Sequence, residues 1–287
     1  MGRHKPRSSL LTGNDVPSPD SLTFLELEWG GRPAYRRELR YGLRTLLADR
    51  PTARPVIYTD VPATYAAESR VRTIDIADCM GAWTDAGRYH FRAKVCVLLD
   101  ALQRFDGPCV LMDTDSFVRP GFAAAVAAAL DTGAVMNFRT GQNPFPDLAG
   151  FTVALPHASL YRYDPADAPV FNSGLIAVTP AHIPALEDAL VLTDALRPST
   201  AHLRHDQEQF AVGEALRAHG VAIGENRTTF VHYCSTWAKQ YMRWRFARSP
   251  GLEMAPIVPA APHIALRKSI TRAYKAGALL GLLPRNL

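Results

Sequence analysis

Short apolar segments with the period of a β-strand alternate along this chain with longer segments whose apolar residues recur at helical spacing. The segments with the strand period are residues 23–28, 55–60, 71–76, 109–112, 134–138 and 171–178. The segments with the helical period are residues 35–47, 91–102, 120–130 and 206–218. Strands that alternate with helices of these lengths form an open, mostly parallel sheet with helices on its faces. We therefore expect a Rossmann-like α/β fold.

Both ends of the chain and one internal stretch depart from this alternation. Residues 1–20 are polar and contain proline, which predicts a disordered leader. Residues 139–170 are rich in Gly, Pro and Asp, which predicts a long loop or a small insertion. Residues 249–287 begin with spaced prolines and end in a basic amphipathic segment. We expect a single domain over residues 21–248, followed by a proline-rich linker and a C-terminal helical extension.

Positive charge is concentrated at the C-terminus. Of 287 residues, 32 are Lys or Arg and 27 are Asp or Glu, a net charge of +5. Residues 239–287 contain nine of the basic residues and only one acidic residue, Glu253, so the rest of the chain is slightly acidic. An acidic body argues against nucleic-acid binding. The basic segment predicts contact with an anionic partner, and the surface of a membrane is one such partner.

The cysteines and the apolar segments bear on the compartment. Cys79, Cys96, Cys109 and Cys234 show no C-x-x-C spacing, which predicts reduced thiols rather than a zinc ribbon or a disulfide framework. No apolar stretch has the length of a signal peptide or of a membrane span. We expect a cytoplasmic protein that can also lie at the membrane periphery through its basic C-terminal segment.

Two carboxylates follow the most apolar of the expected strands. Asp113 and Asp115 come directly after residues 109–112, Cys-Val-Leu-Met. Side chains at i and i+2 of a strand project to the same side, and ligands of open α/β sheets bind at the carboxyl ends of the strands. Converging carboxylates repel one another unless a cation lies between them, and their oxygens suit Mg²⁺ or Mn²⁺. The pattern favours a metal site for a diphosphate substrate, and the alternative is that both acids only cap the next turn.

A strand followed by D-x-D is also typical of phosphatases that resemble the haloacid dehalogenases. In those enzymes the first Asp is a nucleophile and the second is a general acid. This chain has Phe117 where that pattern requires Thr or Val, and its motif lies more than a hundred residues from the start rather than on the first strand. A metal-dependent phosphatase is therefore a second alternative with less support.

Five motifs occur in an order that resembles one enzyme family. They are Lys94, Asp113-Thr114-Asp115, Phe171-Asn172-Ser173-Gly174, Asp206-Gln207-Glu208 and His232-Tyr233-Cys234. This order, over residues 21–245, is similar to that of the retaining glycosyltransferases of family eight. These enzymes have the GT-A fold and include glycogenin-like and lipooligosaccharide galactosyltransferase-like members. The resemblance implies metal-dependent transfer of a sugar, with retention, from a nucleotide diphosphate sugar (a UDP-sugar is expected) to an acceptor that the sequence does not identify.

The resemblance also assigns roles to residues. It implies that Mn²⁺, or Mg²⁺, is bound by Asp113, Asp115 and His232. It implies that Asp206 and Gln207 are the catalytic residues beside the reacting sugar carbon. The donor-binding residues that it implies are Lys94, Asp113, Thr114, Asp115, Asn172, Ser173, Gly174 and Lys239.

The segment that carries Lys239 departs from the family pattern. Ser235 replaces a glycine, one extra residue precedes the lysine, and Gln240 replaces a proline. An imidazole followed by an ammonium still suits a metal ligand followed by a phosphate contact. Arg243 and Arg245, further along, are expected to face the diphosphate or an anionic acceptor.

Several of these residues have structural explanations as well. Residues 172–174 can be only a turn before a strand, and Asp206 can be only a helix N-cap, or the general base of an inverting reaction. Trp29 or Tyr58, near the ends of the first two strands, can stack on the nucleotide base. The same fold without activity would make a nucleotide-sugar or glycan binding module, which is the first alternative function.

Overall fold

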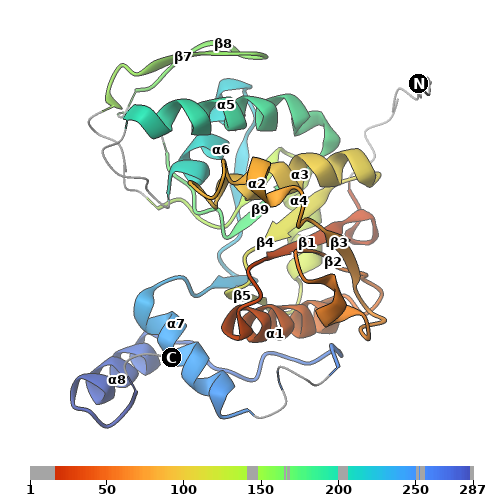
Figure 1. Ribbon diagram of the computed structural model, residues 1–287, viewed down its shortest axis with the longest axis vertical. Coiled ribbons are helices and arrows are strands. Elements are labelled where there is room, and N and C mark those ends of the chain that lie inside the picture. The colour runs from red at the N-terminus through yellow and green to blue at the C-terminus, as the bar shows by residue number, and fades with distance from the viewer. Residues whose placement is uncertain are drawn as a thin grey trace.

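The computed structural model describes residues 17–140, 148–164, 166, 169–199, 206–249, 252 and 256–284, without the side chains of residues 198 and 199. These residues form a central sheet with helices on both faces (Figure 1). The strands of the sheet, in spatial order, are β10 (Ile223–Glu225), β6 (Ala134–Met136), β9 (Leu175–Val178), β4 (Cys109–Met112), β1 (Thr23–Glu28), β2 (Val56–Thr59) and β3 (Arg72–Asp75). Within this sheet only β9 runs antiparallel to its neighbours. The expected open, mostly parallel α/β sheet is confirmed.

Helices cover both faces because the strands direct apolar side chains to each face in turn. The helices on one face are α3 (Arg92–Arg104), α5 (Ile183–Ser199) and α6 (Gln207–Ala218), and those on the other are α1 (Pro33–Asp49) and α4 (Phe122–Leu130). Leu25 and Leu111 belong to the first core, whereas Phe24 and Val110 belong to the second. A strand between two cores is apolar at every position, which explains the composition of β4.

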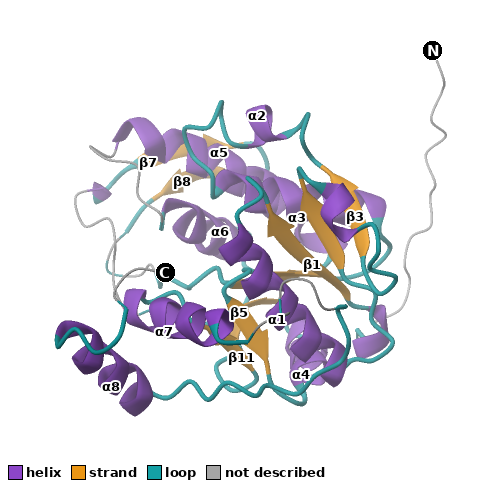
Figure 2. Ribbon diagram, turned by 60° about the horizontal axis from the view of Figure 1, so that its bottom comes forward, coloured by secondary structure: helices purple, strands orange, loops and turns teal. Residues whose placement is uncertain are grey.

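Two strand pairs lie outside the central sheet. β5 (Ser116–Val118) and β11 (Phe230–His232) form an antiparallel ribbon in which His232 lies opposite Ser116 (Figure 2). β7 (Thr152–Leu155) and β8 (Ser159–Arg162) form a hairpin beside α5. This hairpin lies within residues 139–170, so the expected loop or insertion contains a two-stranded sheet. Residues 141–147, 165, 167 and 168 of that stretch lie outside the described part.

The segment before β9 differs from the expected strand over residues 171–178. Residues 172–174 instead form a turn, in which the Asn172 Oδ1 accepts a hydrogen bond of 3.0 Å from the Gly174 N–H. Asn side chains that bond the backbone two residues on offer it an alternative to the sheet ladder. The expected strand is therefore wrong over residues 172–174, where the structure has the turn before a strand that the sequence offered as the alternative, whereas Phe171 pairs with Arg139 in an isolated β-bridge.

Several elements carry no expectation from the sequence. They are α5, α7 (Thr236–Ala247), the short α2 (Met80–Trp83) and the 3₁₀ turns Pro19–Ser21, Pro62–Tyr65 and Pro180–His182. In α7 the buried residues are Ala238, Tyr241, Met242 and Phe246, which follow helical spacing. The sequence therefore contained a helical signal for α7.

The C-terminal helix packs against α7. In α8 (Lys268–Leu279) the buried side chains are Tyr274 and Ala278. The Tyr274 ring centroid lies 5.8 Å from that of Tyr241 and 5.6 Å from that of Trp244, both in α7. The amphipathic helix expected near the C-terminus is thus present, and its apolar face contacts the protein itself.

Residues 256–264, within the proline-rich stretch, run along α1. The Ala260 N–H donates to the Arg44 carbonyl at 3.0 Å, and the Ile264 N–H donates to the Tyr41 hydroxyl at 3.2 Å. Ile264 and Ile257 are buried. The stretch is therefore attached to the domain, although the boundary at residue 248 stays a prediction. Residues 1–16 of the expected leader lie outside the described residues.

The remaining compositional expectations concern thiols and membrane spans. All four cysteines are free, with Cys96 and Cys109 buried and Cys79 and Cys234 exposed, as expected for reduced thiols. Over the described parts of the chain, no helix has both the length and the apolar composition needed to cross a membrane.

Candidate functional site

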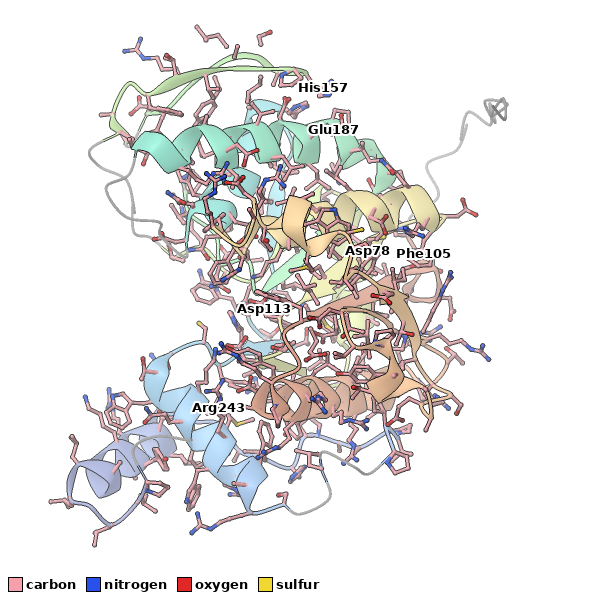
Figure 3. All side chains as sticks on the ribbon, in the orientation of Figure 1. Asp78, Phe105, Asp113, His157, Glu187 and Arg243 are labelled. Carbon is pink, nitrogen blue, oxygen red and sulfur yellow. The ribbon has the colours of Figure 1, made fainter. Side chains whose placement is uncertain are left out.

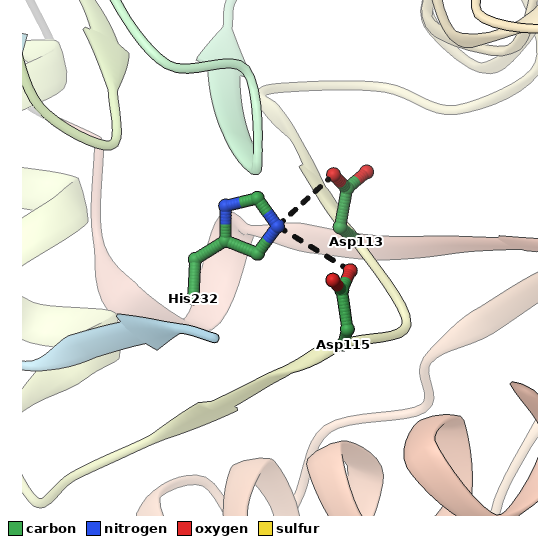
Figure 4. A group of neighbouring side chains, drawn as sticks. All are labelled: Asp113, Asp115 and His232. Atoms are coloured by element: carbon green, nitrogen blue, oxygen red, sulfur yellow. Dashed lines mark ion pairs between the residues drawn. The ribbon is translucent and has the colours of Figure 1, made fainter. Parts of the chain in front are cut away.

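The two aspartates after β4 converge on one point. The chain leaves the sheet at Met112 and turns into β5, and the Asp113 N–H donates to the Gly174 carbonyl at 2.9 Å. The turn is closed by Ser116, whose hydroxyl donates to the Asp113 carbonyl at 2.6 Å. Figure 4 shows the Asp113 and Asp115 carboxylates on the same side of this turn. The convergence expected from their spacing is confirmed.

His232 completes this group from the other strand of the ribbon. Its side chain is 5% exposed, and its Nε2 lies 3.5 Å from Asp113 Oδ2 and 3.3 Å from Asp115 Oδ1 (Figure 4). The ring packs directly on Gly174, where an added Cβ would lie 2.2 Å from the His232 Nδ1. Gly174 is thus required for the position of the imidazole, whereas the sequence had implied a contact with the donor.

The group fits a divalent cation. Asn172 Oδ1 accepts hydrogen bonds from the Asn137 amide and the Gly174 N–H, both at 3.0 Å, and therefore also accepts from the His232 Nδ1 at 2.8 Å. This fixes the Nε2 toward the carboxylates, as outer hydrogen bonds do for histidine ligands of metals. One ligand atom each from Asp113, Asp115 and His232 lies within 4.8 Å of the others. Two carboxylates and an imidazole suit Mn²⁺ or Mg²⁺.

The pKa values of His232 and Asp115 are strongly shifted in this group. Burial alone would lower the pKa of His232, but hydrogen bonds and the charges of Asp115 and Asp113 raise this pKa to about 10. Burial raises the pKa of Asp115, but His232 and Lys239 outweigh it and hold the pKa well below its ordinary value. The Asp115 carboxylate is thus ionised and attracts positive charge at the point where the three side chains meet.

Two lysines flank the carboxylates. The Lys94 Nζ, from α3, lies 2.7 Å from Asp113 Oδ1, and the Lys239 Nζ, from the first turn of α7, lies 2.8 Å from Asp115 Oδ2. Lys239 therefore reaches the site despite the altered motif around it. Thr114 lies between the two aspartates and is partly exposed.

The more distant arginines make contacts within the protein, and their expected contact with a diphosphate or an anionic acceptor stays a prediction. The Arg243 Nε donates to the buried Glu38 carboxylate at 2.9 Å, and its guanidinium lies over the Tyr35 ring. Figure 3 shows Arg243 on α7, below Asp113. Arg245 donates to the hydroxyl of Tyr241 at 3.4 Å within α7 itself. These contacts account for the positions of the Arg243 and Arg245 side chains without a bound diphosphate.

The residues expected at the sugar lie at the start of α6. Asp206 is 8% exposed and Gln207 is fully buried. Asp206 is the N-cap residue of α6, but its side chain makes no capping hydrogen bond to the helix, and its catalytic role stays a prediction. The next residue, Glu208, accepts a hydrogen bond of 2.9 Å from the Ser173 hydroxyl. The first turn of α6 is thereby joined to residues 172–174.

Sequence reasoning assigned no role to two buried acids around the site, although Glu208 belongs to one of the five motifs. Glu208 and Glu26 are each 0% exposed. Burial raises the pKa of Glu208 to about 7, although the charge of Lys94 opposes the shift. Burial and the charges of Asp113 and Asp115 raise the pKa of Glu26 well above its ordinary value. The signal for Glu26 was an acid inside β1, a strand that the fold buries on both faces.

One of the two aromatic residues proposed for the base cannot serve. Tyr58 is fully buried in β2, and its hydroxyl donates to Asp100 at 2.8 Å, so the expectation that it stacks on a nucleotide is wrong. Trp29 is partly exposed beyond the end of β1, with its ring centroid 4.7 Å from that of His90. Trp29 stays a prediction for base stacking.

Comparison with solved structures finds many similar chains, among them the galactosyltransferase LgtC in complex with donor and acceptor sugar analogs. The two chains superpose with a TM-score of 0.54 and 13% sequence identity, over 84% of this chain and 98% of LgtC. No protein-family model and no curated protein sequence matches the chain. The likeness shows the fold: the chain is an α/β protein with the GT-A fold. At the carboxyl end of its central strand β4 it carries a candidate divalent-cation site formed by two aspartates and one histidine.

Proposed function

We propose that the protein is a metal-dependent glycosyltransferase, which moves a sugar from a nucleotide diphosphate sugar to an acceptor. The observation that carries the proposal is the meeting of Asp113, Asp115 and His232 at the carboxyl end of β4 in a GT-A fold. His232 is more than a hundred residues from the aspartates in sequence, so their meeting is a property of the fold. Carboxyl ends of strands are where open α/β sheets bind ligands.

The charged side chains suit a diphosphate leaving group. A divalent cation, Mn²⁺ or Mg²⁺, bound by Asp113, Asp115 and His232 would supply the charge that neutralises a departing diphosphate. Lys94 and Lys239 each hold one of the carboxylates and are placed to donate to phosphate oxygens beside it. Asn172 orients the imidazole through its Nδ1. These residues bind and orient the donor, and Thr114 lies on the same turn.

The sugar end of the donor is proposed to lie beside the first turn of α6. Asp206 and Gln207 stand there as the catalytic residues, next to the turn formed by Asn172, Ser173 and Gly174. The family resemblance implies retention, with Gln207 beside the anomeric carbon. Inversion would instead make Asp206 the general base for the acceptor hydroxyl. The configuration of the product, determined by NMR, distinguishes these two reactions.

The experiment that tests the proposal is a panel of nucleotide sugars. Each is incubated with the protein with and without Mn²⁺, and thermal stabilisation and release of the nucleotide diphosphate are measured. We expect one UDP-sugar to stabilise the protein and to be consumed slowly, both only with the metal. Tight binding without any turnover would support a binding module instead. Hydrolysis of phosphomonoesters with a trapped aspartyl phosphate would support the phosphatase.

A further inference from the structure

A buried hydrogen-bonded chain lies behind the candidate cation site and joins α3, the turn before β9 and α6. The Lys94 Nζ lies 3.4 Å from the Ser173 Oγ and 3.4 Å from the Ser173 carbonyl oxygen, in addition to its contacts with Asp113. The Ser173 hydroxyl donates to Glu208 Oε2 at 2.9 Å, and the Glu208 N–H donates to the Tyr89 hydroxyl at 2.8 Å. Glu208 is therefore held in place through both its main chain and its side chain.

The direction of the hydrogen bonds follows from the number of protons. A serine hydroxyl carries one proton, and that of Ser173 is donated to Glu208. Toward Lys94 the hydroxyl can therefore only accept. The ammonium of Lys94 is thus shared between the Asp113 carboxylate on one side and, on the other, the Ser173 carbonyl oxygen and the Ser173 hydroxyl, which is backed by Glu208.

The two sides of this shared ammonium have different neighbours. Asp113 belongs to the candidate cation site, whereas Glu208 is fully buried and lies outside it. Both carboxylates attract Lys94, which is itself only 7% exposed and stays protonated. A lysine paired closely with Asp113 neutralises charge that a divalent cation would otherwise use, because like charges compete for one carboxylate.

We propose that Glu208 is a positioning residue that draws the Lys94 ammonium toward Ser173 and so leaves the Asp113 carboxylate available to a divalent cation. The inference rests on the proposed function only for the existence of the cation site, and it requires no donor sugar. It assigns a task to a buried acid that touches neither the cation ligands nor, in the proposed reaction, the reacting atoms.

The test is a double-mutant cycle read by Mn²⁺ affinity. The full-length protein is titrated with Mn²⁺ alone, with electron paramagnetic resonance detecting the free ion, for wild type, Glu208→Gln, Lys94→Met and the double variant. We expect Glu208→Gln to weaken Mn²⁺ binding by about fivefold to tenfold and Lys94→Met to strengthen it, within the range of coupling between groups in one network. In the Lys94→Met background, Glu208→Gln should change the affinity less than about twofold, because the lysine through which Glu208 acts is gone.

Two further variants separate positioning from other effects. Ser173→Ala should weaken Mn²⁺ binding as Glu208→Gln does, and Ser173→Thr, which keeps the hydroxyl, should retain wild-type affinity. Glu214→Gln is the matched control, because Glu214 is a buried acid of the same helix that contacts Tyr161 and Arg217 instead. Its Mn²⁺ affinity should equal that of wild type, and thermal unfolding shows that each variant is folded.

The outcomes also separate this inference from the proposed function. If Glu208→Gln weakens Mn²⁺ binding equally with and without Lys94, Glu208 acts only through its long-range charge and the inference is wrong, whatever sugars are turned over. If wild type binds no Mn²⁺, the inference is also wrong. If the cycle gives the expected coupling but no nucleotide sugar is consumed, the positioning role stands and the glycosyltransferase proposal fails.

Discussion

Single residues of the candidate site depend on neighbours that are distant in sequence. Asp113 and Asp115 converge as the sequence predicts, but they do so in the turn between β4 and β5, which Ser116 closes, rather than within a strand. His232 reaches them only because β11 pairs with β5, and the Asn172 amide then orients its ring. The turn that brings the aspartates together is local in sequence, whereas the partner of an imidazole is set by the whole fold.

Replacing the buried aspartate tests the metal assignment. Asp115→Asn keeps the shape of the side chain but removes a charged ligand. We expect the thermal stabilisation of the protein by UDP plus Mn²⁺ to disappear, because the cation that links protein and diphosphate is lost. Asp131→Asn, at an exposed position after α4, is the control and should respond like wild type. An unchanged shift for Asp115→Asn would remove this residue from the metal site.

Gly174 tests the packing of the imidazole. In Gly174→Ala the new Cβ would lie 2.2 Å from the His232 Nδ1, so the ring must move away from the carboxylates. We expect weaker Mn²⁺ binding by calorimetry and a loss of about 1–3 kcal/mol in the free energy of unfolding. Gly213→Ala, inside α6 with its nearest atom at 3.7 Å, should be neutral or stabilising. Equal Mn²⁺ affinity in the two variants would contradict the packing argument.

Glu208 gives the stability a definite pH dependence. Burial raises the pKa of Glu208 in the folded protein to about 7, above the ordinary value of 4.5. The folded state therefore binds the proton more tightly, and this favourable contribution is complete below pH 4.5 and is lost as the pH rises through 7. Relative to Glu208→Gln, wild type should lose up to about 3 kcal/mol of unfolding free energy between pH 4.5 and pH 8, from denaturant titrations. A difference that is independent of pH would contradict this.

At the scale of elements, regular patterns were predictable and irregular ones were not. Apolar periodicity in the sequence predicts the strands β1, β2, β3, β4 and β6 and the helices α1, α3, α4 and α6. The turn at residues 172–174 was predicted only as an alternative to a strand, because Phe171 continues the apolar pattern and a side-chain hydrogen bond has no period. Glu208 belongs to a motif of the sequence, but its buried contact with Ser173 had no local signal, since Ser173 comes from another element.

α8 is the element for which membrane contact stays a prediction. Its buried side packs on α7, and the large apolar side chains that stay exposed near its end are Leu279, Leu280 and Leu282. With the basic residues of α8, these leucines suit an anionic bilayer surface. We expect the full chain to co-sediment with vesicles that contain anionic lipid. The double variant Leu280→Ser, Leu282→Ser should reduce the bound fraction several-fold. Unchanged sedimentation of that variant would exclude these leucines as the contact.

At the scale of the whole molecule, the C-terminal segment packs against the rest of the protein. Residues 256–264 contact α1, and the buried residues Ile257 and Ile264 belong to two different apolar clusters. We therefore expect a chain that stops at Ser249 to unfold at a lower temperature by calorimetry, because it exposes the apolar surface of α1 and α7. An unchanged unfolding temperature would show that the segment contributes nothing to stability. Point variants are consequently better suited than truncation to tests of membrane binding.

The β5–β11 ribbon also sets when the cation site can form during protein synthesis. Asp113 and Asp115 leave the ribosome long before β11, yet their third partner arrives only with His232, in the last fifth of the chain. Non-local pairings of this kind form late in folding because a long loop must close first. A nascent chain whose synthesis has not yet reached residue 232 would therefore contain the two aspartates but not the complete site. Tight cation binding would thus appear only after β11 has joined the fold.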